Sequence, residues 1–167
     1  MSNSNQRKPN QIRIIVDTIN KMPELVRSRA LTLLFGRTVR LTGTVGQTVE
    51  ELTPTRCVIS LKNHKAVQNH IGSVHAIANL LLAESATGYL IGINLPDQRV
   101  PVIKTIKADF VKRSKGNMRA EAELTAEQIE LLHTQDKGET AVRVRITDSE
   151  NKEPIIAEMI WAWTPKR

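Results

Sequence analysis

The feature that most constrains the fold is a long apolar run in the middle of the chain, from Val74 to Leu95. The run is long enough to span a bilayer. It contains four polar side chains that are costly in lipid: His75, Asn79, Glu84 and Asn94. We therefore predict a buried helix, with Ser73 as its N-cap and its end before Pro96. Because this helix is apolar on nearly every side, only enclosure by the rest of the chain can bury it.

The segments on both sides of this helix carry strand patterns with alternating polar and apolar residues. Upstream, the pattern from Val39 predicts two strands around the turn at residues 52–55. Downstream, strands are expected over residues 100–111, 117–124, 141–147 and 155–163, with a turn at 115–117 between the first two of these. Thr125 and Gln128 form a capping box for a short helix. Strands before and after one apolar helix predict an α+β fold, with an antiparallel sheet wrapped around that helix.

The chain has 167 residues, 40% hydrophobic and 25% charged, and no repeat or long linker interrupts it. These values fit a single domain over residues 1–167, with two helices over residues 12–36 and a flexible start at residues 1–11. Cys57 is the only cysteine, so no intramolecular disulfide forms, and we expect no structural metal and no cofactor. The polar N-terminus does not resemble a signal peptide, and we expect a cytoplasmic protein.

The formal net charge of +7 indicates anionic partners without naming one. Residues 1–40 hold eight basic and two acidic residues, and residues 104–119 hold six basic residues and one acidic residue. The chain has only five aromatic residues to stack on bases, so we expect no nucleic acid as partner. Because the apolar run is expected to be a buried helix, we expect no membrane partner either. A smaller polyanion and an ordinary solvated surface fit each basic segment equally well.

Glu84 is the only acidic residue between Asn63 and Pro96, and it lies among leucines and alanines. A buried carboxylate without a partner costs several kcal/mol, so its pKa must rise, or it must find donors or face a wet cavity. Each of these outcomes is typical of a functional site. The alternative is a Glu that reaches solvent at the edge of the helix.

Polar residues and a glycine, from Asn69 to Ala76, lie at the start of the same helix. Free backbone N–H groups there suit a developing oxyanion. His75 is either part of this site or a structural histidine, and the structural role is favoured more strongly for His70. On one helix, His75 and Glu84 are expected on opposite sides and about 13 Å apart along the axis. A site that uses both is then expected between two protomers.

Asn69, Gly72, His75 and Glu84 resemble a motif of the hot-dog thioesterases, especially the phenylacetate-degradation type. That motif reads N-x-x-G-x-x-H-G-G, with an Asp or Glu nine residues after the His, and the spacing agrees at all four positions. Nearly the whole chain is similar to an uncharacterised bacterial family of thioesterase-like hot-dog proteins. The resemblance implies a hot-dog fold and a homodimer, or a tetramer made of two such dimers.

The resemblance also implies roles for individual residues. Glu84 is expected to act as general base or nucleophile, the Ala76 N–H as oxyanion donor, and Asn69 and His75 as the polar pair that positions carbonyl and water. Gly72 belongs to the substrate-binding set. Ile77 replaces the second glycine of the motif and adds bulk near the substrate. Thr87 lies one turn after Glu84 on the same face and either orients a water or has a structural role. Three further residues are expected to hold coenzyme A phosphates: Lys112, Arg113 and Lys115.

The expected function is hydrolysis of an acyl-CoA or acyl-carrier-protein thioester. A non-catalytic module that binds or senses acyl thioesters is the alternative, and Glu84 separates the two because a sensor needs no buried ionisable carboxylate. A nucleic-acid-binding protein lacks a recognition motif here. A Cys–His enzyme built on Cys57 is disfavoured, because a lone Cys on a strand is most simply a small buried side chain.

Overall fold

The computed structural model describes residues 9–166. Residues 1–8 of the expected flexible start lie outside the described part of the chain. Asn10 belongs to the expected flexible start, but it is buried, and both the nitrogen and the oxygen of its side-chain amide form hydrogen bonds. Its amide nitrogen donates to the carbonyls of Gly92 and Leu95, both at 2.6 Å, and its amide oxygen accepts the Arg13 N–H. Asn10 thereby joins the first helix to the end of the central one.

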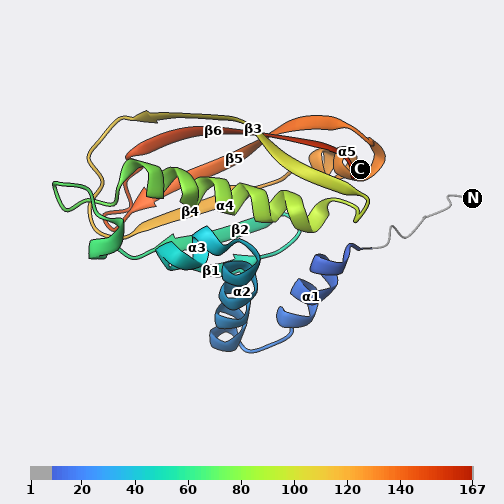
Figure 1. The fold of residues 1–167 in the computed structure, drawn as a ribbon, viewed down its shortest axis with the longest axis horizontal. Helices are drawn as coiled ribbons and strands as arrows, with labels where there is room; N and C mark the ends of the chain where they lie inside the picture. Colours follow the sequence, from blue (N-terminus) through green and yellow to red (C-terminus); the bar gives the residue numbers. More distant parts are fainter. Residues whose placement is uncertain (1–8, 167) are drawn as a thin grey trace, which may run out of the picture.

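Helices precede and interrupt the strands of one sheet (Figure 1). In chain order the elements are α1 (Gln11–Ile19), α2 (Glu24–Thr38), α3 (Arg40–Val45), β1 (Gln47–Leu52), β2 (Arg56–Leu61), the 3₁₀ turn η1 (Lys65–Val67), α4 (Ala76–Asn94), β3 (Arg99–Phe110), β4 (Met118–Glu123), α5 (Ala126–Thr134), β5 (Gly138–Asp148) and β6 (Ile155–Pro165). The predicted α+β architecture is confirmed.

The six strands form one antiparallel sheet in the order β1-β2-β4-β5-β6-β3, which curves around α4 (Figure 1). The turn at 115–117 does not make a hairpin of β3 and β4, because β3 crosses to the far edge and pairs with β6 from Arg99↔Pro165 to Phe110↔Ile155. Gly116 has φ 69° in this crossover, and a Cβ there would lie 2.4 Å from the Ser149 hydroxyl. Close packing against the β5–β6 turn, rather than a hairpin, explains this glycine.

The central helix α4 is long and apolar enough to cross a membrane by length and composition alone, and most of it is buried against the sheet. Leu82, Leu90 and Ile91 are fully buried and belong to the core. The enclosure is incomplete, however. Ile77 is 64% exposed, and Glu84 on the same helix is partly exposed. One side of an otherwise buried helix is therefore open to ligands or to a partner.

The expected strand from Val39 is wrong over residues 40–45, which form the helix α3. The hydroxyls of its two threonines donate hydrogen bonds to carbonyls of the preceding turn: Thr42 Oγ1 donates to Val39 O, and Thr44 Oγ1 donates to Arg40 O. The helix packs on α2 where two glycines meet, since a Cβ on Gly43 would lie 2.6 Å from the Gly36 carbonyl oxygen. Tertiary packing overrides strand propensity here.

The two edges of the sheet differ in how their backbone groups are satisfied. On β1, Val49 O accepts from the Ser28 hydroxyl at 2.8 Å, and Val49 N–H donates to Thr32 Oγ1 at 2.9 Å. Asn20 Nδ2 donates to Leu52 O at 2.8 Å. These side chains block β1 against further strand pairing, whereas nothing in the described residues pairs with the outer edge of β3.

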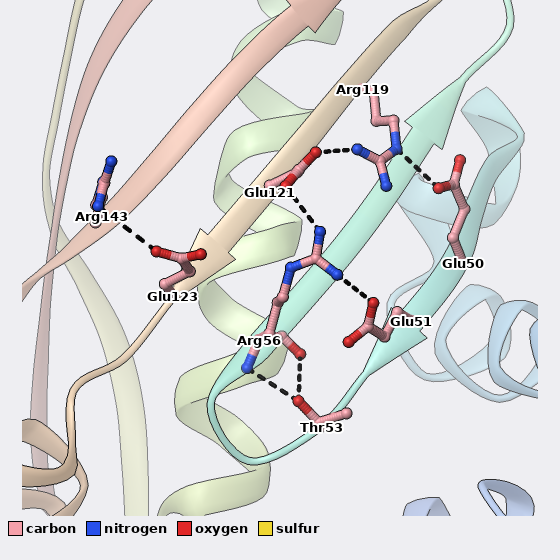
Figure 2. Close-up of polar contacts among 8 residues, drawn as sticks. All are labelled: Glu50, Glu51, Thr53, Arg56, Arg119, Glu121, Glu123 and Arg143. Carbon is pink, nitrogen blue, oxygen red and sulfur yellow. Dashed lines mark hydrogen bonds and ion pairs between the residues drawn. The ribbon is translucent and has the colours of Figure 1, made fainter.

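The outer face of the sheet carries a network of arginines and glutamates (Figure 2). Arg56 bridges Glu51 and Glu121, and Arg119 bridges Glu50 and Glu121. The hydrogen bond from Arg56 is the main reason that the pKa of Glu121 is lowered. Because these side chains are partly exposed, each pair is worth at most about 1 kcal/mol. These charged side chains cover the outer face of the sheet, and the apolar core lies against its inner face.

Candidate functional site

The open side of α4 forms one wall of an apolar groove with a volume of about 490 Å³. The helix α3, the segment 66–68 and the strand β3 supply the other walls. Three lining residues have polar side chains, Gln68, His75 and Glu84, and the others are apolar: Leu41, Val45, Ala66, Val67, Ile77, Ala78, Leu80, Leu81 and Ile106. A mostly apolar groove with a few convergent polar groups is typical of a small-molecule site.

Glu84 lines this groove and is partly buried on α4. Desolvation by burial raises the pKa of its carboxyl group above the usual value. Within residues 9–166, no side chain or backbone N–H donates a hydrogen bond to its carboxylate oxygens. A carboxylate with a raised pKa and no partner is suited to accept a proton from a bound water.

His75 is the N-cap of α4, a role that we expected for Ser73. Its Nδ1 accepts the Ile77 N–H at 3.1 Å, so the neutral ring carries its proton on Nε2. Ser73 instead accepts from Arg113 Nε at 3.3 Å and donates to Ser114 O at 3.2 Å. The local sequence predicted the helix start within three residues but not which side chain caps it.

The structure places His75 and Glu84 along the same groove of one chain. The expectation of opposite sides counted His75 as a helical residue. Its backbone, at φ −59° and ψ 143°, is not helical, so the regular 100° step does not apply to it. The two side chains therefore line one groove, although about 13 Å along the axis of α4 still separates them.

Asn69 does not line the groove. Its Oδ1 accepts the N–H groups of Ile71 and Ser73, both at 3.1 Å, and its carbonyl accepts the Gly72 N–H. Gly72 has φ 76°, which only glycine adopts at little cost, so it lets this loop turn toward α4. Asn69 and Gly72 thus shape the loop that carries His75.

Gln68 reaches the groove in the place where the motif suggested Asn69. The sequence analysis did not assign Gln68 to the site. The only sequence signal for it is that this amide residue directly precedes Asn69 of the motif. Its backbone bridges Val74 across the loop, which holds the residue beside the start of α4. No hydrogen bond within the described residues engages the Gln68 side-chain amide, so its two N–H donors and its oxygen are free for a ligand.

The first two backbone N–H groups of α4 differ in whether they have a hydrogen-bond acceptor. The Ala76 N–H has no acceptor within the described residues, which suits the oxyanion role suggested for it. The Ile77 N–H is already taken by His75. The exposed Ile77 side chain lines the groove and narrows the approach to it.

Thr87 does not reach the groove, because it is fully buried. Its Oγ1 accepts the Trp161 Nε1–H and donates to Ala83 O, both at 2.9 Å. These contacts tie α4 to β6 and leave no exposed hydroxyl to orient a water. Thr87 therefore has a structural role in this fold.

None of the three basic residues expected at coenzyme A phosphates lines the groove. Arg113 Nη2 donates to Ile71 O at 2.8 Å, which fixes the loop before α4. Lys115 pairs with Glu150 at 2.9 Å. Lys112 is exposed, and its side chain makes no ion pair with the residues that the structure describes. Of the three, Lys112 alone is unoccupied.

The described residues contain no group of three or more His, Cys, Asp and Glu side chains arranged to hold a metal ion. Cys57 is fully buried on β2, and burial raises the pKa of its thiol. A buried neutral thiol is a poor nucleophile. Among the described groups, Glu84 is the one best placed for acid–base chemistry in the groove.

Solved structures with this fold include several proteins named as thioesterases. A Pseudomonas aeruginosa protein, described as of unknown function and as a probable thioesterase, superposes with a TM-score of 0.75 at 24% identity, over 87% of this chain and 97% of its own. A thioesterase from Haemophilus influenzae gives 0.67 at 14% identity, over 83% and 90%. A thioesterase from Staphylococcus aureus gives 0.65 at 18% identity, over 76% and 100%.

These superpositions define the class of fold as hot-dog, as the motif suggested. Residues 27–163 match the model of one protein family, the domain of unknown function DUF4442, and the chain belongs to that family. No curated protein sequence matches the chain. The match begins within α2, so α1 lies outside the family's shared region.

Proposed function

We propose that the protein hydrolyses acyl thioesters in the groove along α4. The observation that carries the proposal is Glu84, a carboxylate with a desolvation-raised pKa in an apolar groove. The unpaired Ala76 N–H lies at the start of the same helix, where the helix dipole favours developing negative charge. An apolar groove with a base and an oxyanion donor suits an acyl chain with a reactive carbonyl.

In the proposed reaction, Glu84 takes a proton from a water whose oxygen attacks the thioester carbonyl carbon. Because about 12 Å of helix axis separates Ala76 from Glu84 in one chain, the carbonyl oxygen accepts from the Ala76 N–H and the His75 Nε2–H of the partner protomer as it becomes negative. Collapse of the tetrahedral intermediate breaks the C–S bond, and the leaving thiolate takes the proton from Glu84. In the other route, the Glu84 carboxylate attacks the carbonyl carbon, the C–S bond breaks and the thiolate leaves, and water then hydrolyses the resulting anhydride to the free acid and Glu84.

Support also comes from a relative. Two structures of the Staphylococcus aureus relative carry alanine in place of a glutamine and of a glutamate that lie fifteen positions apart. Asn69 and Glu84 have the same separation here. Because Asn69 closes the loop, we assign the amide role at the carbonyl or water to its neighbour Gln68, which lines the groove.

The proposed substrate is an acyl-CoA or an acyl-carrier-protein thioester, and the proposed setting is the cytoplasm. Of the three basic residues expected at the phosphates, Lys112 alone forms no ion pair or hydrogen bond through its side chain within residues 9–166, so it is the first candidate for a phosphate contact. Lys112→Gln is expected to raise KM with little change in kcat, because the phosphates lie far from the reacting carbonyl. An unchanged KM at low salt would remove Lys112 from the substrate site.

The proposed assembly is a homodimer formed through β3. Its outer edge is free, and four large apolar side chains on it are exposed: Val100, Val102, Ile106 and Phe110. Pairing of two such edges would bury these side chains and cover the groove at Ile106. Sedimentation at low micromolar concentration is expected to give one species of dimer mass, and a stable folded monomer would contradict the assembly.

The deciding experiment replaces Glu84 with Gln and follows free-thiol release from a panel of acyl thioesters. Glu84→Gln keeps the shape and removes the base or nucleophile, so kcat is expected to fall at least about a hundredfold while binding survives. Hydrolysis at the parent rate would refute the assignment. If the parent protein binds acyl-CoA but hydrolyses no thioester, the non-catalytic binding module becomes the better function.

A further inference from the structure

The helices α1 and α2 project from the β1 edge of the sheet (Figure 1) and expose an unusual number of aliphatic side chains. Each of the following is at least 40% exposed: Ile14, Ile15, Met22, Leu25, Val26 and Leu33. Leu25, at 69%, is the most exposed of them. Single exposed apolar residues are ordinary, whereas five on two adjacent helices, with Met22 in the segment that joins them, indicate a contact surface.

The same two helices are basic. Residues 9–46 hold six basic and two acidic residues, and one of the acidic residues, Asp17, is paired with Arg13. Arg29 and Arg37 are exposed and form no ion pair or hydrogen bond with any residue from 9 to 166. Apolar and basic side chains are thus mixed on this side of the molecule.

The mixture follows one face of α2. Val26, Arg29, Leu33 and Arg37 recur at spacings of three and four, so they form one exposed stripe. Beside it lies a hollow of about 460 Å³ between α2, α3 and β1, lined by Arg29, Leu33 and Arg37 together with the small residues Thr32, Gly36, Gly43 and Thr48. Arg29 and Arg37 lie about 12 Å apart along the helix, so each can contact a different phosphate.

We propose that this α1–α2 surface docks on an anionic phospholipid bilayer. Exposed aliphatic side chains enter the headgroup–acyl boundary, while the unpaired arginines meet lipid phosphates. A nucleic acid fits less well, because the only aromatic ring on these helices, Phe35, is buried and stacked on Tyr89. We expected no membrane partner from the sequence because α4 is buried, but surface docking needs no spanning helix.

Docking at this surface has a consequence for the groove along α4. Gly43 on α3 lines the hollow, and Leu41 and Val45 on α3 line the groove, so α3 is a wall of both cavities. A docked molecule therefore holds the groove close to the lipid surface, where long acyl chains partition. The proposal itself does not depend on hydrolysis in the groove.

The test is co-sedimentation with vesicles of phosphatidylcholine alone and with 30% phosphatidylglycerol. The full-length protein is expected to bind only the anionic vesicles, and more weakly as salt rises. Arg29→Gln with Arg37→Gln is expected to lower the partition coefficient about 25-fold, at about fivefold per arginine. Leu25→Ser with Leu33→Ser is expected to lower it as well, since it removes apolar side chains from the boundary.

Lys107→Gln with Lys112→Gln is the matched control, because it removes the same charge from exposed, unpaired cations outside α1 and α2. It is expected to change partitioning less than twofold, and unfolding transitions of all variants should match the parent. Equal binding to neutral vesicles, an equal loss in the lysine control, or no vesicle binding would overturn the proposal. DNA binding that the arginine pair abolishes, without vesicle binding, would make this a nucleic-acid surface instead.

Discussion

Replacement of Thr87 by Val tests whether this residue holds the fold together or serves the groove. Valine keeps the shape of the fully buried side chain and has a similar helix propensity. It removes the acceptor of the Trp161 Nε1–H, which lies at 2.9 Å and is buried from water. The Ala83 carbonyl that Thr87 also contacts can still accept a bond within α4. The cost is therefore that of one orphaned indole donor, about 1–3 kcal/mol in the free energy of unfolding.

A double-mutant cycle isolates this bond. Trp161→Phe removes the indole donor, so Thr87→Val is expected to cost less than about 0.5 kcal/mol in that background. Chemical denaturation followed by circular dichroism gives the four free energies, and each kcal/mol corresponds to about 2–4 °C in Tm for a chain of this size. Thioester hydrolysis by Thr87→Val should stay within about twofold of the parent rate.

Two results would refute this reasoning. A cost that is the same in both backgrounds would mean that the hydrogen bond to Trp161 contributes nothing to stability. A large loss of activity at unchanged stability would return Thr87 to the reaction site. Either result would contradict the separation between the buried contacts of α4 with β6 and the groove on its open side.

Three further predictions concern other residues of the same region. Gly88→Ala should lower the free energy of unfolding by about 1–3 kcal/mol in chemical denaturation, because its Cβ would lie 2.7 Å from the Trp161 ring. Gly92→Ala should raise the free energy of unfolding by up to about 1 kcal/mol, because the space around its Cβ is open. The pKa of Glu84 is raised in the folded state, so ionisation of its carboxyl group opposes folding. The free energy of unfolding of Glu84→Gln should therefore exceed that of the parent by an amount that grows as pH rises from about 4 through that raised pKa. A difference that does not change with pH would contradict this prediction. Gln68→Ala should lower kcat/KM for thioesters at least about tenfold, with Gln68→Asn rescuing part of it in steady-state kinetics, and parent-like kinetics would exclude Gln68 from the site.

The parts of the fold that were predictable from sequence are those with a strong local signal. The apolar run around Glu84 predicted a buried central helix because no other environment accommodates so many apolar residues in succession. Thr125 and Gln128 predicted the start of α5, since a capping box depends on residues three positions apart. Glu84 itself stood out by chemistry, as an isolated carboxylate among leucines and alanines.

The rest depended on contacts between residues far apart in the chain. The Gly36–Gly43 approach made residues 40–45 helical, and pairing with β6 carried β3 to the opposite edge, although nothing in the local patterns distinguishes these outcomes. The residue pattern was enough to predict that an apolar helix with one carboxylate lies at the centre. Which polar side chains share the groove with Glu84 depended on the folded loop, because Gln68 and Asn69 are adjacent in sequence and a loop closed by hydrogen bonds directs only Gln68 into the groove.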